Sequence, residues 1–244
     1  MTKHSTIRLL SWNARRANSA AIDLADRFGA EVLLLQEGQA ASSWSGEAVG
    51  VPVAGRTWGS WVLVRSGALE PIAIAEYPGW VIGARWQRRD AEDVYLFSVH
   101  SPTPPRVSYV AESQAIVTAI CASVPSAAPL VIGGDFNFKS LGQRLPSETI
   151  QTTMAELQAI QEFRDRGLSV AWHDCHPGKP LQQTLRWTND QSVPFHCDGF
   201  LTRNLGHGTV NCEVILPESE PPTSDHNAVL LTVSLTATAL ESIK

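Results

Sequence analysis

The sequence is poor in cysteine, has little excess of either charge and contains no long apolar run. Its four cysteines, Cys121, Cys175, Cys197 and Cys212, form no C-x-x-C pair, which indicates a reduced, intracellular protein. Neither a membrane-spanning stretch nor an apolar signal region is present, so we expect a soluble cytoplasmic protein. The formal net charge of −5 excludes the global basic field that dominates sequence-independent binding of nucleic acid. Any phosphate binding must therefore be local.

Several catalytic motifs are also missing. The sequence has no G-x-S-x-G nucleophile elbow, no P-loop and no G-x-G-x-x-G, so the chemistry of serine hydrolases, P-loop enzymes and dinucleotide-binding enzymes fits it poorly. The run Trp172-His173-Asp174-Cys175-His176 has the composition of a zinc site. Ligands this crowded, however, cannot converge on one ion without a distant partner. A functional site must therefore come from other polar residues.

Composition and pattern predict one α/β domain that spans residues 1–244. The chain is 43% apolar and 18% charged, as globular proteins are, and nothing marks a boundary. Strands are predicted at residues 6–12, 31–36, 58–65, 70–76, 80–86, 93–100, 129–134, 197–202, 210–215 and 227–235. Helices are predicted at residues 19–28, 107–123 and 147–166. Because helices separate only some of the strands, the pattern predicts mixed sheets covered by helices.

The run from Pro129 to Asn137 is the most informative segment of this pattern. Four apolar residues lead into Gly133-Gly134-Asp135-Phe136-Asn137, which predicts a buried central strand whose glycines allow a tight turn at its end. Side chains two apart in an extended segment point the same way, so Asp135 and Asn137 are expected on one side. The alternative is a structural turn in which both residues bond their own backbone.

Other apolar runs also end on, or begin beside, a polar side chain. Asn13, Glu37 and His100 close three runs, Asp198 interrupts a fourth, and Asp225 with His226 precedes a fifth. Each alone is consistent with a turn residue, a solvated strand end or a bonded core polar group. Their recurrence favours a single functional edge, because burial beside such an edge explains all of them together.

This set of residues suits the cleavage of a phosphate ester. A hard cation such as Mg²⁺, or alternatively Mn²⁺, prefers the oxygens that Asn13, Glu37 and Asp225 offer. The amide of Asn137 and a protonated His100 or His226 supply donors for a phosphate oxygen. Either Asp135 or a histidine held by Asp198 can orient the attacking water.

In order and spacing, these residues resemble the endonuclease/exonuclease/phosphatase superfamily, the DNase I-like proteins. The resemblance covers nearly the whole chain and rests on SWN at 11–13, LLLQE at 33–37, SVHSP at 98–102, GGDFN at 133–137, FHCDGFL at 195–201 and SDHNAV at 224–229. It implies a four-layered α/β sandwich, in which two face-to-face mixed sheets are flanked by helices and the site lies at one edge.

The resemblance also implies roles. Asn13, Glu37 and Asp225 look like metal-site residues, with Glu37 the principal ligand. Asp135 looks like the residue that positions or deprotonates water. The resemblance also implies that His226 is a catalytic imidazole paired with Asp198 and that His100 is a second catalytic imidazole. Asn137 looks like the amide that holds the phosphate, and Asn13 and Asn137 both look like substrate-binding residues.

Three local features qualify the match. A histidine at position 100 is typical of the DNase I, sphingomyelinase and 5-phosphatase branches of the family, whereas abasic endonucleases tend to have tyrosine there. Residues 58–62 contain no acidic side chain that could pair with His100. The I-D-Y pattern usual in the family is replaced by Cys197-Asp198-Gly199. Residues 183–198 resemble small bacterial members and place Thr184, Trp187 and His196 as substrate-binding candidates.

The resulting functional hypothesis is a magnesium-dependent phosphodiesterase, a monomer acting on DNA or RNA. The alternatives are a phosphatase or sphingomyelinase-like hydrolase of a small or lipid phosphoester, and a catalytically silent binding protein. Local candidates for phosphate binding are Arg15 with Arg16, Arg85 with Arg88 and Arg89, and Lys139 with Arg144. Four of these side chains discriminate between the substrates: they favour a polyanion if they cluster beside the site and a compact substrate if they are scattered, namely Arg85, Arg88, Arg89 and Lys139.

Overall fold

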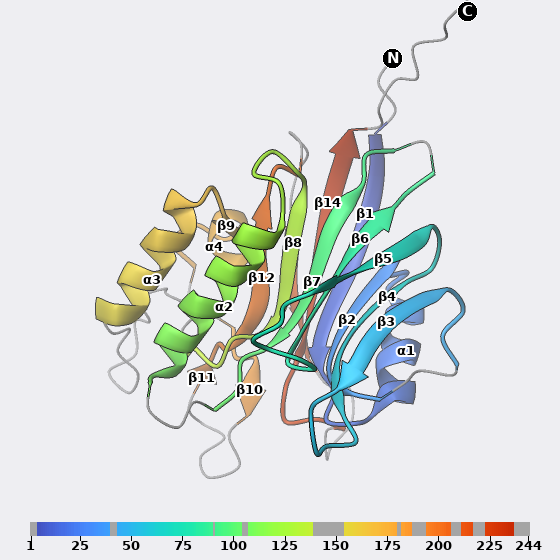
Figure 1. Cartoon of the computed structure of the whole chain (residues 1–244), viewed down its shortest axis with the longest axis horizontal. Helices are drawn as coiled ribbons and strands as arrows, with labels where there is room; N and C mark the ends of the chain where they lie inside the picture. Colours follow the sequence, from blue (N-terminus) through green and yellow to red (C-terminus); the bar gives the residue numbers. More distant parts are fainter. Residues whose placement is uncertain are drawn as a thin grey trace, which may run out of the picture.

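Two six-stranded mixed sheets lie face to face and carry helices on their outer faces (Figure 1). The computed structural model describes residues 4–39, 43–89, 91–103, 107–138, 154–179, 182–186, 194–205, 211–216 and 223–236. The helix, sheet, sheet, helix order confirms the predicted four-layered α/β sandwich. No helix in the described ranges is long and apolar enough to span a bilayer.

The first sheet has the strand order β13-β14-β1-β2-β4-β3. Its strands are β1 (His4–Asn13), β2 (Val32–Gly38), β3 (Glu47–Pro52), β4 (Gly59–Val64), β13 (Asn211–Ile215) and β14 (Ala228–Thr236). β1 and β2 run parallel and are joined by α1 (Asn18–Arg27). α1 buries Ala21, Ile22 and Ala25 in a cluster with strand residues such as Leu33, so it covers the outer face of this sheet.

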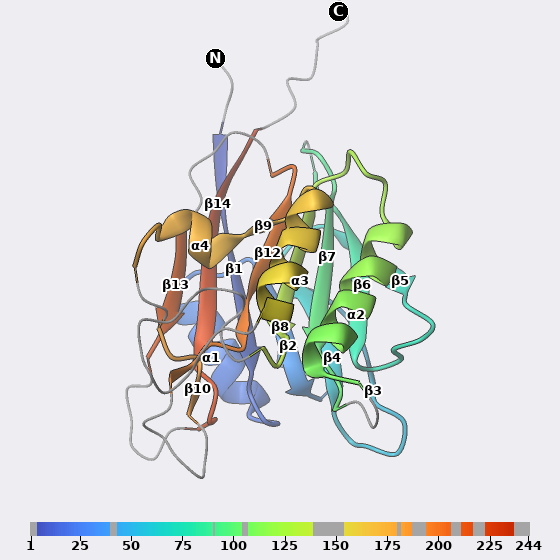
Figure 2. The same cartoon turned by 90° about the vertical axis from the view of Figure 1, so that its left-hand side faces the viewer.

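The second sheet has the strand order β5-β6-β7-β8-β12-β9. Its strands are β5 (Ala68–Ala73), β6 (Val81–Gln87), β7 (Val94–His100), β8 (Leu130–Asp135), β9 (Ser169–Val170) and β12 (Asp198–Arg203). Helices α2 (Tyr109–Ser123) and α3 (Met154–Asp165) lie side by side over its outer face (Figure 2). Ile116 and Ile120 of α2 and Phe163 of α3 bury their side chains against Ile132 of β8.

The main core lies between the two sheets. Leu34 from β2, Val131 from β8 and Phe200 from β12 are each at most 1% exposed and belong to one cluster. Strands covered on both faces in this way read as continuous apolar runs, which is why the sequence marks β2, β4 and β8 clearly. This packing fixes the relative position of the strand ends.

Some short elements were not predicted from sequence. β3 has no buried residue and pairs only with β4 at the sheet edge, so it lacks the apolar alternation that identifies a strand. The crowded run at 172–176 largely forms α4 (Ala171–Cys175). β10 (Leu185–Arg186) and β11 (Pro194–Phe195) pair with each other. Of the helix predicted at 147–166, residues 147–153 lie outside the described residues.

The polar strand ends meet at one edge of the sandwich. β1, β2, β7 and β8 all end there, whereas the antiparallel strands β12 and β14 begin there. Within the second sheet, Asp135 is in register with His100 of β7 on one side and Asp198 of β12 on the other. Strand pairing alone therefore brings three of the predicted site residues together.

Candidate functional site

Asp135 is presented by a strand rather than by the glycine turn expected from the sequence. β8 extends through Gly133 and Gly134 to Asp135, which corrects the expectation that the glycines form the turn. Their role is close packing: a Cβ on Gly134 would lie 1.9 Å from the carbonyl oxygen of Val99. The chain turns at Asn137, two residues after the end of β8, where φ is 55°. This turn, and not strand alternation, sets the direction of the Asn137 side chain.

The two carboxylate oxygens of Asp135 have different surroundings: one bonds the backbone of the turn, and the other faces the side chains of the site. Oδ1 accepts the backbone N–H of Asn137 at 2.9 Å, which is the structural turn considered as the alternative. Oδ2 accepts the side-chain amide of Asn13 at 3.2 Å and lies 3.7 Å from Nε2 of His226 and 3.8 Å from Nε2 of His100. Asp135 therefore bonds the turn with one oxygen and faces the site with the other, whereas the Asn137 amide bonds Ser101 and not its own backbone.

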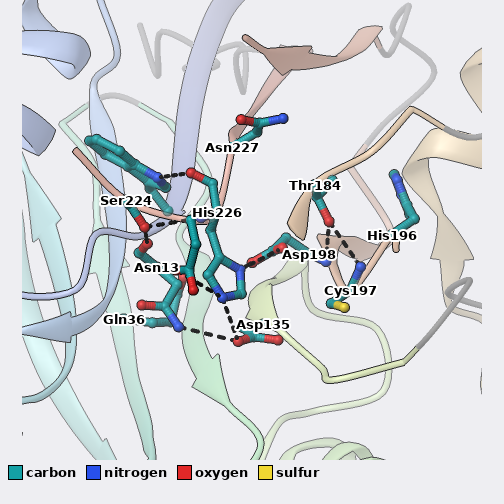
Figure 3. Close-up of polar contacts among 12 residues, drawn as sticks. Asn13, Gln36, Asp135, Thr184, His196, Cys197, Asp198, Ser224, His226 and Asn227 are labelled. Carbon is teal, nitrogen blue, oxygen red and sulfur yellow. Dashed lines mark hydrogen bonds and ion pairs between the residues drawn. The ribbon is translucent and has the colours of Figure 1, made fainter. Parts of the chain in front are cut away.

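Asp198 and His226 form a buried pair at the centre of the site (Figure 3). Nδ1 of His226 lies 3.1 and 3.0 Å from the two carboxylate oxygens of Asp198. Burial alone would lower the pKa of His226, but the charges of Asp198 and Asp135 outweigh it and raise the pKa to about 10. Burial raises the pKa of Asp198 to about 6, against the opposing effect of His226. At neutral pH His226 is therefore a cation that faces two carboxylates.

Backbone and side-chain contacts hold this pair in place. The hydroxyl of Thr184 accepts the N–H groups of Cys197 and Asp198 at 2.9 and 3.1 Å (Figure 3). On the other side, the indole of Trp12 donates to the carbonyl oxygen of His226 at 2.9 Å. Ser224 donates to the carbonyl oxygen of Asn13 at 2.7 Å and accepts the N–H of His226. The ends of β1, β12 and β14 are thus joined directly beside the imidazole.

Glu37 is aimed by an irregularity in β2. The pairing of β2 with β4 shifts register between Leu35 and Gly38, and Glu37 has a φ of 50°. A β-bulge of this kind re-aims a side chain at a sheet end. The amide nitrogen of Asn13 lies 3.4 Å from Oε1 of Glu37, so Asn13 bridges Glu37 and Asp135. The amide oxygen of Asn13 accepts the N–H of Arg15 at 3.4 Å.

Asp225 has one engaged oxygen and one buried oxygen. Oδ2 lies 2.6 Å from Nη1 of Arg15. Oδ1 is buried without a hydrogen-bond partner in the described residues and lies 3.9 Å from Nε2 of His226. A buried carboxylate oxygen without a hydrogen-bond partner is a group that a hard divalent cation could bind. Separately, Asp135, Asp198 and His226 offer ligand atoms within 4.8 Å of one another, but a protonated His226 has no lone pair with which to bind a metal ion.

His100 differs from His226 in its surroundings. Its ring contacts Trp58 and Trp80, with centroid distances of 5.7 and 5.2 Å, and its Nδ1 is buried with no hydrogen-bond partner in the described residues. Burial lowers the pKa of His100, although Asp135 opposes the change. His100 is therefore neutral near pH 7. Its ring contacts Trp58, which belongs to the segment 58–62 where a DNase I-like enzyme could hold an acidic partner.

Two of the three remaining substrate-binding candidates, Thr184 and His196, lie in the described residues, and both are buried. Thr184 is fully buried behind Asp198. His196 is also buried; its Nδ1 lies 2.6 Å from the carbonyl oxygen of Gln182, and its ring contacts Trp172. In Figure 3 the imidazole of His196 lies on the far side of Asp198 from His226. Trp187 lies outside the described residues.

Sequence reasoning missed two serines that support the turn after β8. Ser113 of α2 donates to the carbonyl oxygen of Phe136 at 2.8 Å and contacts the hydroxyl of Ser101. Ser101 accepts the amide of Asn137 through its carbonyl oxygen at 2.8 Å. The available signal was a small polar residue, Ser113, at helical spacing with the buried Ile116, Val117 and Ile120.

Of the basic residues considered for phosphate binding, Arg85, Arg88 and Arg89 lie at the end of the second sheet opposite the site. Arg85 pairs with Tyr95 of β7, five residues and so about 16 Å before the end of that strand at His100. Its guanidinium contacts Asp93 and Glu70. Arg88 and Arg89 follow the same end of β6, and Lys139 and Arg144 lie outside the described residues. Arg15 is the basic side chain of this group that contacts a site carboxylate in the described structure.

Comparison with solved structures supports the assignment of the fold. An AP endonuclease from Archaeoglobus fulgidus superposes with a TM-score of 0.70 at 14% identity, covering 92% of this chain and 98% of that chain. A 3′–5′ exonuclease from Neisseria meningitidis gives a TM-score of 0.69 at 17% identity, with coverage of 92% and 98%. An endonuclease/exonuclease/phosphatase from Bacteroides vulgatus gives 0.68 at 16% identity, with coverage of 95% and 99%.

A comparison with family models identifies the family. A search of curated proteins found no match to this chain. Residues 10–226 match the model of the Endonuclease/Exonuclease/phosphatase family, and this range contains Asn13, Glu37, His100, Asp135, Asp198 and His226. The chain therefore belongs to the endonuclease/exonuclease/phosphatase family.

Proposed function

We propose that the chain is a magnesium-dependent phosphodiesterase that cleaves DNA or RNA by attack of an activated water on phosphorus. The observation that carries this proposal is the position of Asp135. Its Oδ2 lies within 3.8 Å of Nε2 of both His100 and His226, and His226 is held by Asp198. The structural neighbours include the AP endonuclease and the 3′–5′ exonuclease named above, and also a 3′ phosphatase from Neisseria bound to a product DNA hairpin. These neighbours support a nucleic-acid substrate.

The residues at the edge fit a divalent cation. Glu37 and the orphaned Oδ1 of Asp225 would be oxygen ligands of such a cation, and the amide oxygen of Asn13 would be the third. Oxygen donors of this kind suit Mg²⁺ or Mn²⁺. When bound, the cation would neutralise charge on a phosphate oxygen and favour ionisation of water.

The catalytic roles follow from charge and position. Asp135 orients the attacking water, because its Oδ2 is the acceptor that faces the site. The protonated His226 donates a hydrogen bond to the phosphate through Nε2, while Asp198 fixes Nδ1–H and stabilises the cation. Thr184 acts behind Asp198 as a positioning residue.

Two amides and one neutral imidazole complete the substrate contacts. Asn13 and Asn137 flank Asp135. The Asn137 amide donates one hydrogen bond, to Ser101, and keeps one N–H for phosphate. The Asn13 amide contacts both Asp135 and Glu37, so a phosphate would take the N–H that reaches Glu37 at 3.4 Å. His100, neutral and packed against two tryptophans, binds substrate as a hydrogen-bonding group rather than as a cation.

Hydrolysis of a generic diester tests this proposal. Bis(4-nitrophenyl) phosphate is incubated with wild type, Asp135→Ala, His226→Ala and the remote control Asp93→Ala, each with magnesium and with EDTA. We expect magnesium-dependent turnover in wild type and in Asp93→Ala, and a loss of about 10³-fold or more in the two site variants. A wild type without metal-dependent turnover on diesters or monoesters would support the catalytically silent alternative.

A second candidate is a hydrolase of a small or lipid phosphoester, either a phosphatase or a sphingomyelinase-like enzyme. It is favoured by the ion pairing of Arg85 at the far end of β6, since an extended duplex requires a track of basic contacts. A panel of single-stranded DNA, duplex DNA, RNA, sphingomyelin and inositol phosphates separates the two. Higher kcat/KM on polynucleotides supports the nuclease, whereas higher kcat/KM on a compact ester supports the second candidate.

A further inference from the structure

Arg15 lies on a turn that is bonded to two of the candidate metal-site residues. The turn leaves the end of β1, where the N–H of Arg15 donates to the side chain of Asn13. The next N–H, from Arg16, donates to the carbonyl oxygen of Glu37 at 3.0 Å. The backbone of Arg15 is therefore fixed by the same residues that define the site.

The Arg15 guanidinium also contacts the third candidate metal-site residue. Its Nη1 lies 2.6 Å from Oδ2 of Asp225, and the side chain of Arg15 is 51% exposed whereas that of Asp225 is 21% exposed. A guanidinium carries five N–H donors. In the described structure Arg15 uses its Nη1 group on Asp225, so the other side-chain donors remain available for a ligand at the surface.

Stability does not account for this arrangement. Arg15 and Arg16 have φ values of 47° and 73°, and a non-glycine residue in this region costs about 1–2 kcal/mol. An exposed ion pair returns only about 0–1 kcal/mol. Two strained residues in succession thus cost more than the Arg15–Asp225 pair contributes, and strain of this kind is concentrated at sites where a ligand is held.

We propose that Arg15 is a substrate-binding cation, whose guanidinium stays on Asp225 and donates its other N–H groups to a non-bridging oxygen of the substrate phosphate. This inference rests on the proposed phosphoesterase function. Asp225 links the two cationic groups, because its Oδ1 lies 3.9 Å from Nε2 of His226 while its Oδ2 binds Arg15. Arg15 and His226 can therefore contact one phosphate from neighbouring positions, and guanidinium geometry suits two phosphate oxygens at once.

Phosphate binding by the metal-free protein tests this proposal. Calorimetric titration with inorganic phosphate compares wild type with Arg15→Gln, Arg15→Lys and Arg85→Gln. Arg85 is a matched control because it is also ion-paired and 41% exposed but lies far from the site. We expect Arg15→Gln to raise the Kd for phosphate by about 10-fold or more, Arg15→Lys to raise it less, and Arg85→Gln to leave it within about twofold.

Steady-state kinetics on bis(4-nitrophenyl) phosphate with magnesium provide the second readout. We expect kcat/KM to fall by about 10²-fold in Arg15→Gln, the usual effect of removing one preorganised donor, with partial recovery in Arg15→Lys. An unchanged phosphate Kd in Arg15→Gln, an equal loss in Arg85→Gln, or no phosphate binding by wild type would overturn the proposal. If wild type binds phosphate through Arg15 but turns over no ester, the proposed function fails while the Arg15 assignment stands.

Discussion

His226 lies between two carboxylates, and this position sets its charge. Asp198 contacts Nδ1 at 3.0 Å, whereas Asp135 faces Nε2 at 3.7 Å. Both negative charges favour the imidazolium, and they outweigh a burial that leaves the residue only 8% exposed. A cation that retains one outward N–H is suited to a phosphate oxygen.

Replacing Asp198 with asparagine should shift the pH dependence of catalysis. Without the carboxylate, the pKa of His226 falls from about 10, so its protonated form is lost at lower pH. We expect kcat at pH 8 to fall by about 10²-fold or more and the alkaline limb of the pH–rate profile to move toward neutrality. A profile with the same alkaline limb as wild type would show that Asp198 does not control the charge of His226.

The same pair should make stability depend on pH. The pKa of His226 is raised from 6.5 to about 10 in the folded protein, so its contribution to the free energy of unfolding is complete below about pH 6.5 and is lost as pH rises toward 10. Urea unfolding of the metal-free protein should therefore show stability falling by a few kcal/mol across this window. In His226→Gln the decline should flatten; an equally steep decline would assign it to other groups.

At the scale of elements, the site depends on places where the strands depart from ideal geometry. The bulge in β2 aims Glu37, the turn after β8 aims Asn137, and Gly134 allows β7 to approach β8 closely. The sequence indicated that polar residues end these strands, because each follows an apolar run. It did not indicate the bulge or the true position of the turn, since both depend on pairing with strands distant in the chain.

Gly134→Ala should destabilise the protein more than a glycine replacement at an open turn. The new Cβ would lie 1.9 Å from the carbonyl oxygen of Val99, so one of the two strands must move. We expect the free energy of unfolding to fall by about 3 kcal/mol or more. Gly55 also has a positive φ but nothing within 4 Å of its Cβ position, so Gly55→Ala should cost about 1 kcal/mol. Equal losses in urea unfolding would contradict the close-packing role.

Thr184 connects the short strand β10 to the Asp198–His226 pair. Its hydroxyl accepts two backbone N–H groups, and Leu185 bridges to His226. Thr184→Val removes that acceptor and leaves both donors buried, so we expect a loss of about 2 kcal/mol in stability and a lower kcat with little change in KM. Thr184→Ser keeps the hydroxyl and should restore kcat; failure of the serine variant to do so would assign the effect to packing.

For the whole molecule, the strand and helix pattern predicted mixed sheets covered by helices and one functional edge, and the family resemblance implied the layer order. Buried strands such as β8 are continuous apolar runs, and their ends carry Asp135, Glu37 and His100, so both the core and the site left a local signal. The edge strand β3 left none, since no residue in it is buried. The ion pair between Arg15 and Asp225 left no local sequence signal either, because the two residues are 210 positions apart in the chain.

We predict that the polar residues at the ends of β1, β2, β7 and β8 act together as one metal-dependent site. The family match over residues 10–226 and the meeting of the ends of β1, β2, β7 and β8 at one edge support a single centre. The cations Arg85, Arg88 and Arg89 lie at the far end of β6, too distant to contact a phosphate bound beside Asp135.

Magnesium titration of diester hydrolysis by wild type and Glu37→Gln tests this claim most directly. The remote variant Glu70→Gln serves as the control, since Glu70 pairs with Arg85. We expect no hydrolysis in EDTA, and an apparent magnesium affinity that falls about 10-fold or more in Glu37→Gln but is unchanged in Glu70→Gln. Hydrolysis by wild type that persists in EDTA, or a Glu37→Gln titration that superposes on wild type, would contradict the account.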